Sequence, residues 1–182
     1  NAFLQGIGFD KTAGQGVGRE LSAGCYDSRR QKMQLQERVK NCNGCAACVV
    51  GCKYVCVKMK DLEEGRVKRE PIIDENGCSR CNACFLFCPL FNPVELPEFE
   101  EFYEYSEAFE GRDMPKLYRE TMRNVKAGQQ VEFVGTLCEI AALKSLSGDK
   151  IRPNLTLKPL YCDDEKRAKD PACAVCTFYQ ED

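Results

Sequence analysis

The chain has 182 residues, a formal net charge of −2 and 14 cysteines, and it contains neither histidine nor tryptophan. The nearly balanced charge gives no overall positive field, which argues against a nucleic-acid-binding protein and against attraction to an anionic membrane surface. The longest apolar run, residues 83–91, is far too short to cross a bilayer, so no membrane span is expected.

The first 40 residues form a glycine-rich arm followed by a basic lead-in. Glycine at this density costs backbone entropy and packs poorly, so we expect a mobile arm that wraps a partner. A phosphate-binding loop is the alternative, but Lys11 precedes the run Gly14, Gly16 and Gly18, where a P-loop has its lysine after the glycines. Residues 29–40 predict a short basic helix that leads into the first cysteines.

Two cysteine runs with the spacing C-x2-C-x2-C-x3-C define residues 41–94 as a ferredoxin unit. In such a unit three thiolates of one run bind one [4Fe-4S] cluster and the fourth crosses to the other cluster. The sequence therefore predicts two clusters, one held by Cys42, Cys45, Cys48 and Cys88 and the other by Cys78, Cys81, Cys84 and Cys52. Short strands are expected at residues 57–59 and 72–73, around a polar turn at residues 61–65.

Zinc sites and disulfides are the alternatives for these eight cysteines. Structural zinc usually draws on two separated ligand pairs, often with histidine, which this chain lacks. No apolar signal segment is evident, so we expect the cytoplasm, where disulfides are rare. Cys25 and Cys56 have no partner at motif spacing; Cys56 is interpreted as a buried filler beside the cluster, with a spare ligand as the alternative.

Residues 95–128 are expected to form a connector and a helix. The acidic and aromatic stretch 95–110 predicts a helix with its aromatic rings on one side, either packed on the main body or serving as an acidic docking face. A second helix is predicted from Asp113, as its N-cap, to Gly128 just past its end.

Residues 129–182 predict a small α/β unit. A strand at residues 131–134, an apolar helix at 138–146 and a strand at 155–161 form a β-α-β element with parallel strands. Cys138 opens the helix and Cys162 follows the second strand, so both thiols are expected at the carboxyl edge of the sheet. With Cys173 and Cys176 they could hold a third cubane cluster; structural zinc and scattered free thiols are the alternatives.

Several segments carry a family resemblance. The stretch VEFVGTLCEIAALKSL, with KPLYC, CAVCTFYQED and CPLFNP, resembles the beta subunit of coenzyme F-420 hydrogenase and its dehydrogenase relatives. The resemblance implies that a third cubane is bound by Cys138, Cys162, Cys173 and Cys176. It also implies hydride chemistry at a bound flavin, but the flavin-binding central region of that family has few counterparts in this chain.

The combined expectation is an α+β iron-sulfur protein that relays single electrons within a larger oxidoreductase complex. Its expected cofactors are two [4Fe-4S] clusters and a third at the C-terminal cysteines, and its expected partners are other redox subunits, such as a flavoprotein or a hydrogenase or dehydrogenase subunit. No catalytic residue is assigned. The alternative is a beta-type subunit that oxidises reduced coenzyme F-420 or a similar hydride carrier through bound FAD.

Overall fold

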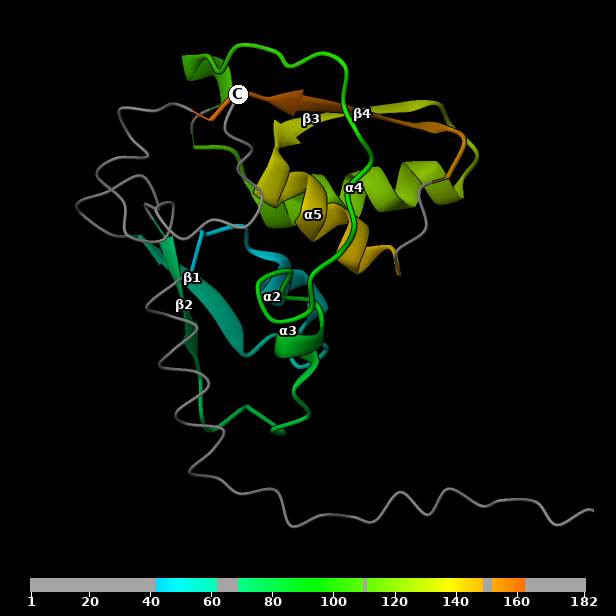
Figure 1. Cartoon of the computed structure of the whole chain (residues 1–182). Coiled ribbons are helices and arrows are strands. Elements are labelled where there is room, and N and C mark those ends of the chain that lie inside the picture. The colour runs from blue at the N-terminus through cyan, green and yellow to red at the C-terminus, as the bar shows by residue number, and fades with distance from the viewer. Residues whose placement is uncertain (1–41, 62–68, 110, 149–151, 163–182) are drawn as a thin grey trace, which may run out of the picture.

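The structure, a computed structural model, describes residues 42–61, 69–109, 111–148 and 152–162. These residues form an α+β fold with two small sheets, an antiparallel pair and a parallel pair. Helices α4 (Met114–Lys126) and α5 (Leu137–Leu146) lie beneath the parallel sheet of β3 (Val131–Thr136) and β4 (Leu155–Leu160) (Figure 1). The short helices α2 (Ala47–Gly51) and α3 (Ala83–Leu86) lie below them, and the hairpin of β1 (Val57–Asp61) and β2 (Arg69–Ile73) stands to one side (Figure 1). The expected glycine-rich arm and basic helix fall outside the described residues. In the part that is described, no helix is long and apolar enough to cross a membrane.

The hairpin pairs β1 (Val57–Asp61) with β2 (Arg69–Ile73), from Val57 opposite Ile73 at its open end to Asp61 opposite Arg69. Both predicted strands are therefore confirmed, each longer than expected. Pro71 is tolerated because a two-stranded sheet has only edge strands, whose outer hydrogen-bonding groups need no partner strand. The predicted turn lies mostly in residues 62–68, outside the described residues.

Helix α4 (Met114–Lys126) matches the prediction at both ends. The Asp113 carboxylate accepts a hydrogen bond from the Lys116 amide at 3.1 Å, and Gly128 just past the end has φ of 79°. A side-chain oxygen at the N-cap satisfies an amide that has no partner inside the helix, and glycine adopts positive φ without strain. The helix buries one face, made of Met114, Tyr118, Thr121 and Val125.

Strands β3 (Val131–Thr136) and β4 (Leu155–Leu160) are parallel and flank α5 (Leu137–Leu146), as predicted. A capping box starts α5: the Thr136 side chain accepts from the N3 amide, and the Glu139 carboxylate accepts from the Thr136 amide at 2.9 Å. Arg112, just before α4, connects that segment to this turn: its guanidinium donates to the Val134 carbonyl at 2.8 Å and pairs with the Glu139 carboxylate at 3.0 Å.

The helix expected over residues 95–110 is wrong. Residues 95–106 are irregular, and only η1 (Glu107–Phe109) makes a single 3₁₀ turn. Tyr103 instead pairs with the edge of β4: its amide donates to the Pro159 carbonyl at 2.9 Å and its carbonyl accepts from the Tyr161 amide at 2.8 Å. The backbone groups that a helix would have used are thereby satisfied by the sheet.

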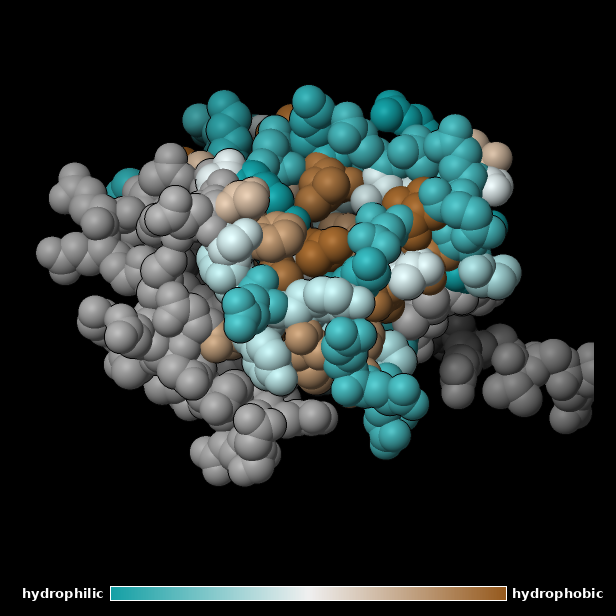
Figure 2. Space-filling model, turned by 90° about the horizontal axis from the view of Figure 1, so that it is seen from above, coloured by the Kyte–Doolittle hydropathy of each residue, from teal (hydrophilic) through white to brown (hydrophobic). Residues whose placement is uncertain are grey.

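The aromatic rings of this connector still pack, but against the sheet rather than along a helix. Phe102 contacts Tyr161 with ring centroids 5.2 Å apart, and Phe99 contacts Phe102 at 6.1 Å. Figure 2 shows the face above β3 and β4, where apolar side chains gather in the middle and hydrophilic ones frame them. Tyr161 is 52% exposed on this part of the molecule.

One hydrophobic core joins the first cysteine run to the α/β element. Its buried members come from both parts: Cys45, Ala46, Ala47, Met114, Tyr118, Phe133, Ile140, Ala142 and Leu143. Tyr118 is fully buried and its hydroxyl donates to the Cys45 carbonyl at 3.0 Å. Burial raises the pKa of Tyr118 well above its ordinary value, so the hydroxyl keeps its proton and acts as donor.

Replacing Tyr118 with phenylalanine tests this junction. The change removes the only polar atom of the side chain and deprives the buried Cys45 carbonyl of this donor, so we expect a loss of about 1–3 kcal/mol of unfolding free energy. Urea unfolding of the anaerobically prepared chain, followed by far-ultraviolet circular dichroism, measures it. The control Tyr161→Phe, at an exposed ring, should change stability by less than about 0.5 kcal/mol. Equal effects of the two changes would contradict the role given to Tyr118.

Candidate metal centre

The two cysteine runs adopt the same backbone conformation. We call residues 42–48 the first loop and residues 78–84 the second loop. The third and fifth positions of both loops have positive φ: 67° at Gly44, 61° at Ala46, 56° at Arg80 and 59° at Asn82. In each loop the amide of the third residue donates to the sulfur of the first cysteine at 3.4 Å, and a short helix follows, α2 (Ala47–Gly51) or α3 (Ala83–Leu86).

This shared conformation is costly at two of its four positions. Ala46 and Arg80 are neither glycine nor asparagine, and a left-handed residue of this kind costs roughly 1–2 kcal/mol, whereas Asn82 adopts it more readily. Such strain persists where the surrounding structure enforces it, and it gathers at ligand sites. A backbone that enters and leaves the left-handed region turns its amide groups into a concave nest for anions, a device found at many iron-sulfur sites.

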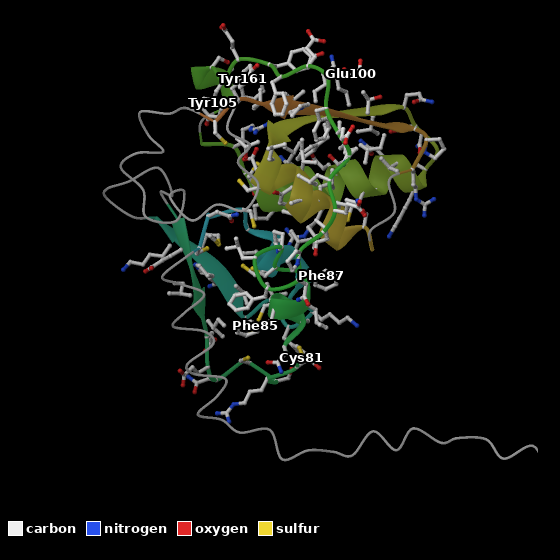
Figure 3. The ribbon with its side chains drawn as sticks, viewed as in Figure 1. Cys81, Phe85, Phe87, Glu100, Tyr105 and Tyr161 are labelled. Atoms are coloured by element: carbon white, nitrogen blue, oxygen red, sulfur yellow. The ribbon has the colours of Figure 1, made fainter. Side chains whose placement is uncertain are left out.

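A hollow opens between the second loop and the start of the hairpin. We call it the cysteine hollow; it is lined by Cys52, Tyr54, Cys56, Val57, Cys78, Ser79, Cys81, Asn82 and Cys84. All four cysteines predicted to hold the second cluster therefore line one space, together with Cys56. Among the described residues, Cys81 lies at the opposite end from Glu100, Tyr105 and Tyr161, and it is exposed (Figure 3).

Backbone geometry favours thiolates in this hollow. Hydrogen bonds, above all from the Ala83 amide at the start of α3, lower the pKa of Cys81. Burial alone would raise the pKa of Cys52, but hydrogen bonds from the Cys56 side chain and from nearby backbone amides outweigh it and lower that pKa. A lowered pKa increases the thiolate fraction, and the thiolate is the form that binds metal.

Cys56 is the partner of Cys52. The two sulfurs lie 3.3 Å apart, both residues are buried, and they form no disulfide. Burial, followed by the interaction with Cys52, raises the pKa of Cys56 to about 12. Of the two, Cys52 is the more readily ionised, and either sulfur can donate in the hydrogen bond between them. The sequence interpretation of Cys56 as a buried side chain is confirmed, but spacing alone gave no sign of its direct contact with Cys52.

The cysteines predicted for the first cluster lie at the junction with the α/β element. Cys45, Cys48 and Cys88 are buried and Cys42 is half-buried. Burial raises the pKa of Cys45 well above its ordinary value, and repulsion from nearby sulfurs, first Cys88, then Cys138 and Cys48, raises it further. Those sulfurs are thus close enough to interact, and sequence spacing gave no sign that Cys138 is among them.

Close packing holds the two loops together. A side chain at Gly51, the end of α2, would bring its Cβ to 2.9 Å from the Cγ atom of Phe87, so only glycine allows this approach of α2 and α3.

In the first loop the Asn43 side-chain oxygen accepts a hydrogen bond from the Cys45 amide. The side-chain nitrogen of Asn43 is buried and has no partner among the described residues. That nitrogen is available to donate to an anionic group held by the loop.

The C-terminal cysteines are described only in part. Cys138 lies in the first turn of α5 and Cys162 lies two residues beyond β4; both are half-buried. Since Thr136 is paired with Leu160 at the ends of the parallel strands, both cysteines leave the same edge of the sheet, as expected. The Cys138 sulfur lies 3.1 Å from the Thr136 hydroxyl. Cys25, Cys173 and Cys176 fall outside the described residues.

The donor set fits iron-sulfur clusters. The cysteine sets predicted for the first and second clusters both offer thiols, and the chain has no histidine. In each loop a backbone amide also donates a hydrogen bond to the sulfur of the first cysteine. Within the described ranges no three cysteine, aspartate or glutamate side chains are placed to share a single metal ion. A cubane distributes its thiolates over four irons, so its ligands lie farther apart than those of one zinc ion.

Comparison with known proteins adds no relative. The chain matches no protein-family model, no curated protein and no solved structure.

Thiol reactivity in the metal-free chain tests this geometry. Because Cys81 is exposed and has a lowered pKa, we expect it to react fastest of the described cysteines with iodoacetamide near neutral pH; Cys45, buried and with a raised pKa, should react slowest among them. Raising the pH should speed Cys45 more than Cys81, since Cys81 is already the more ionised. Mass spectrometry of timed samples measures each rate. Uniform rates would mean that the loops do not hold this arrangement without metal.

Proposed function

We propose that this chain is an iron-sulfur protein that relays single electrons within a larger oxidoreductase complex. The observation that carries the proposal is the repeated loop: two runs with identical cysteine spacing adopt one strained backbone conformation, with an amide directed at the first sulfur of each. A [4Fe-4S] cluster supplies one-electron transfer, which matches a site made of thiols with no acid-base histidine.

The ligand assignment follows the ferredoxin pattern, in which the fourth cysteine of each run crosses over. Its support at the second cluster is that Cys52 lines the cysteine hollow with the three cysteines of the second loop. At the first cluster, charge repulsion from Cys88 contributes to the raised pKa of Cys45, which is compatible with both sulfurs binding one cluster. The proposed ligands are thus Cys42, Cys45, Cys48 and Cys88 for the first cluster and Cys78, Cys81, Cys84 and Cys52 for the second.

A third cluster at Cys138, Cys162, Cys173 and Cys176 is part of the proposal. Its support is the common sheet edge from which Cys138 and Cys162 leave. The interaction of Cys138 with Cys45 would bring this group beside the first cluster, as a relay needs. Cys81, exposed at the far end, would bring the second cluster near the surface, where another redox subunit can approach. The proposed compartment is the cytoplasm, whose reducing conditions keep thiols available.

The alternative is a beta-type subunit of the coenzyme F-420 hydrogenase family that oxidises a hydride carrier through FAD. The resemblance of the strand-turn-helix around Cys138 favours it. A hydride delivers two electrons together and a cubane accepts one, so such a chain needs a flavin to separate them. We propose that the isolated chain binds no flavin and oxidises no hydride donor, but passes electrons from dithionite to a viologen.

Iron and sulfide analysis of anaerobically purified chain tests the proposal. Three cubanes predict roughly twelve irons and as many sulfides per chain. A value near eight with about one zinc would remove the third cluster and leave the other two, and iron near zero would contradict the whole proposal. Stoichiometric flavin, with cluster reduction by a deazaflavin or nicotinamide donor, would favour the alternative function instead.

A further inference from the structure

The chain places a fifth thiol in the cysteine hollow, beyond the four that one cubane uses. Cys56 is 6% exposed, its sulfur lies 3.3 Å from that of Cys52, and both side chains line the same hollow. It also belongs to one buried cluster with Cys48, Cys52 and Val57, against which Cys78 and Cys84 pack. The Cys56 sulfur therefore lies next to the position from which the Cys52 sulfur would bind a metal in this hollow.

The backbone holds Cys56 firmly in this position. Its carbonyl accepts a hydrogen bond from the Asp74 amide at 2.8 Å, which fixes it to the end of the hairpin. A Cβ at Gly77 would lie 3.6 Å from the Cys56 Cβ, so the chain before the second loop packs directly against it. Cys56 is therefore held between the residue before Cys78 and the sulfur of Cys52.

A strained turn brings the two sulfurs together. Val55, between Tyr54 and Cys56, has φ of 55° and is 69% exposed. Positive φ at a β-branched residue is a genuine outlier, and no burial of the Val55 side chain compensates for it. The Val55 amide donates to the Cys52 carbonyl at 3.3 Å, which closes the turn and returns the chain to the hollow.

We propose that Cys56 is a reserve ligand of the second cluster, able to bind the iron that Cys52 binds. The inference rests on the proposed iron-sulfur function. In the exchange, the bond between iron and the Cys52 sulfur breaks, a bond between the same iron and the Cys56 sulfur forms, and the Cys56 proton moves to Cys52. No electron is transferred, so the cluster keeps its oxidation state. When Cys52 is absent, the proton leaves to water.

Alanine variants test this exchange, because alanine offers no oxygen ligand in place of sulfur. We expect Cys52→Ala to keep the iron and sulfide content of the unaltered chain, with an altered paramagnetic resonance signal for the second cluster in the reduced state. Cys56→Ala should keep the iron and sulfide content, because Cys52 remains to bind the iron. The double variant Cys52→Ala, Cys56→Ala should lose about four irons or retain an incomplete cluster.

The comparison of the single and double variants separates two failures. If Cys52→Ala loses as much iron as the double variant, Cys56 is no ligand and the inference is overturned, while an intact iron content in the unaltered chain preserves the proposed function. If the unaltered chain itself holds no iron, the proposed function fails first. Circular dichroism of each variant checks that the chain is folded; a variant with retained iron and an altered signal supports the exchange directly.

Discussion

The burial of the first cysteine loop against α4 and α5 is the constraint on which the rest of the structure depends. Ala46 and Ala47 have almost no exposed surface, and the Tyr118 hydroxyl reaches from α4 to the Cys45 carbonyl. Side chains larger than alanine at these positions would not fit between the loop and the α/β element, because interiors are close-packed. The loop is thus held by packing as well as by any metal that it binds.

A close approach of α2 and α3 joins the second loop to the first. Gly51 ends α2 where Phe87 follows α3, and any Cβ there would collide with the ring. The first loop is therefore buried at the junction, while the second lies at the surface with Cys81 exposed. If both bind clusters, the buried one faces the α/β element and the exposed one faces solvent, an arrangement suited to passing electrons inward.

Much of this architecture could be predicted from residue patterns. Cysteine spacing identified the two loops, Asp113 and Gly128 bounded α4, and alternating apolar segments identified the parallel strands. The helix over residues 95–110 could not be excluded, because its aromatic periodicity is real while the pairing of Tyr103 with β4 is a tertiary contact. Likewise, the Cys52–Cys56 contact accompanies a left-handed conformation at Val55. Valine rarely adopts this conformation, so the residue pattern does not predict it.

Anomalous diffraction from anaerobically grown crystals, recorded at the iron and zinc absorption edges, tests the central claim most directly. The account predicts iron signals at two separate positions in this part of the chain. One should lie in the cysteine hollow beside Cys78 and Cys81, and the other between the first loop and Cys88. Zinc signals at these positions, or a cysteine hollow without any iron signal in iron-replete protein, would contradict it.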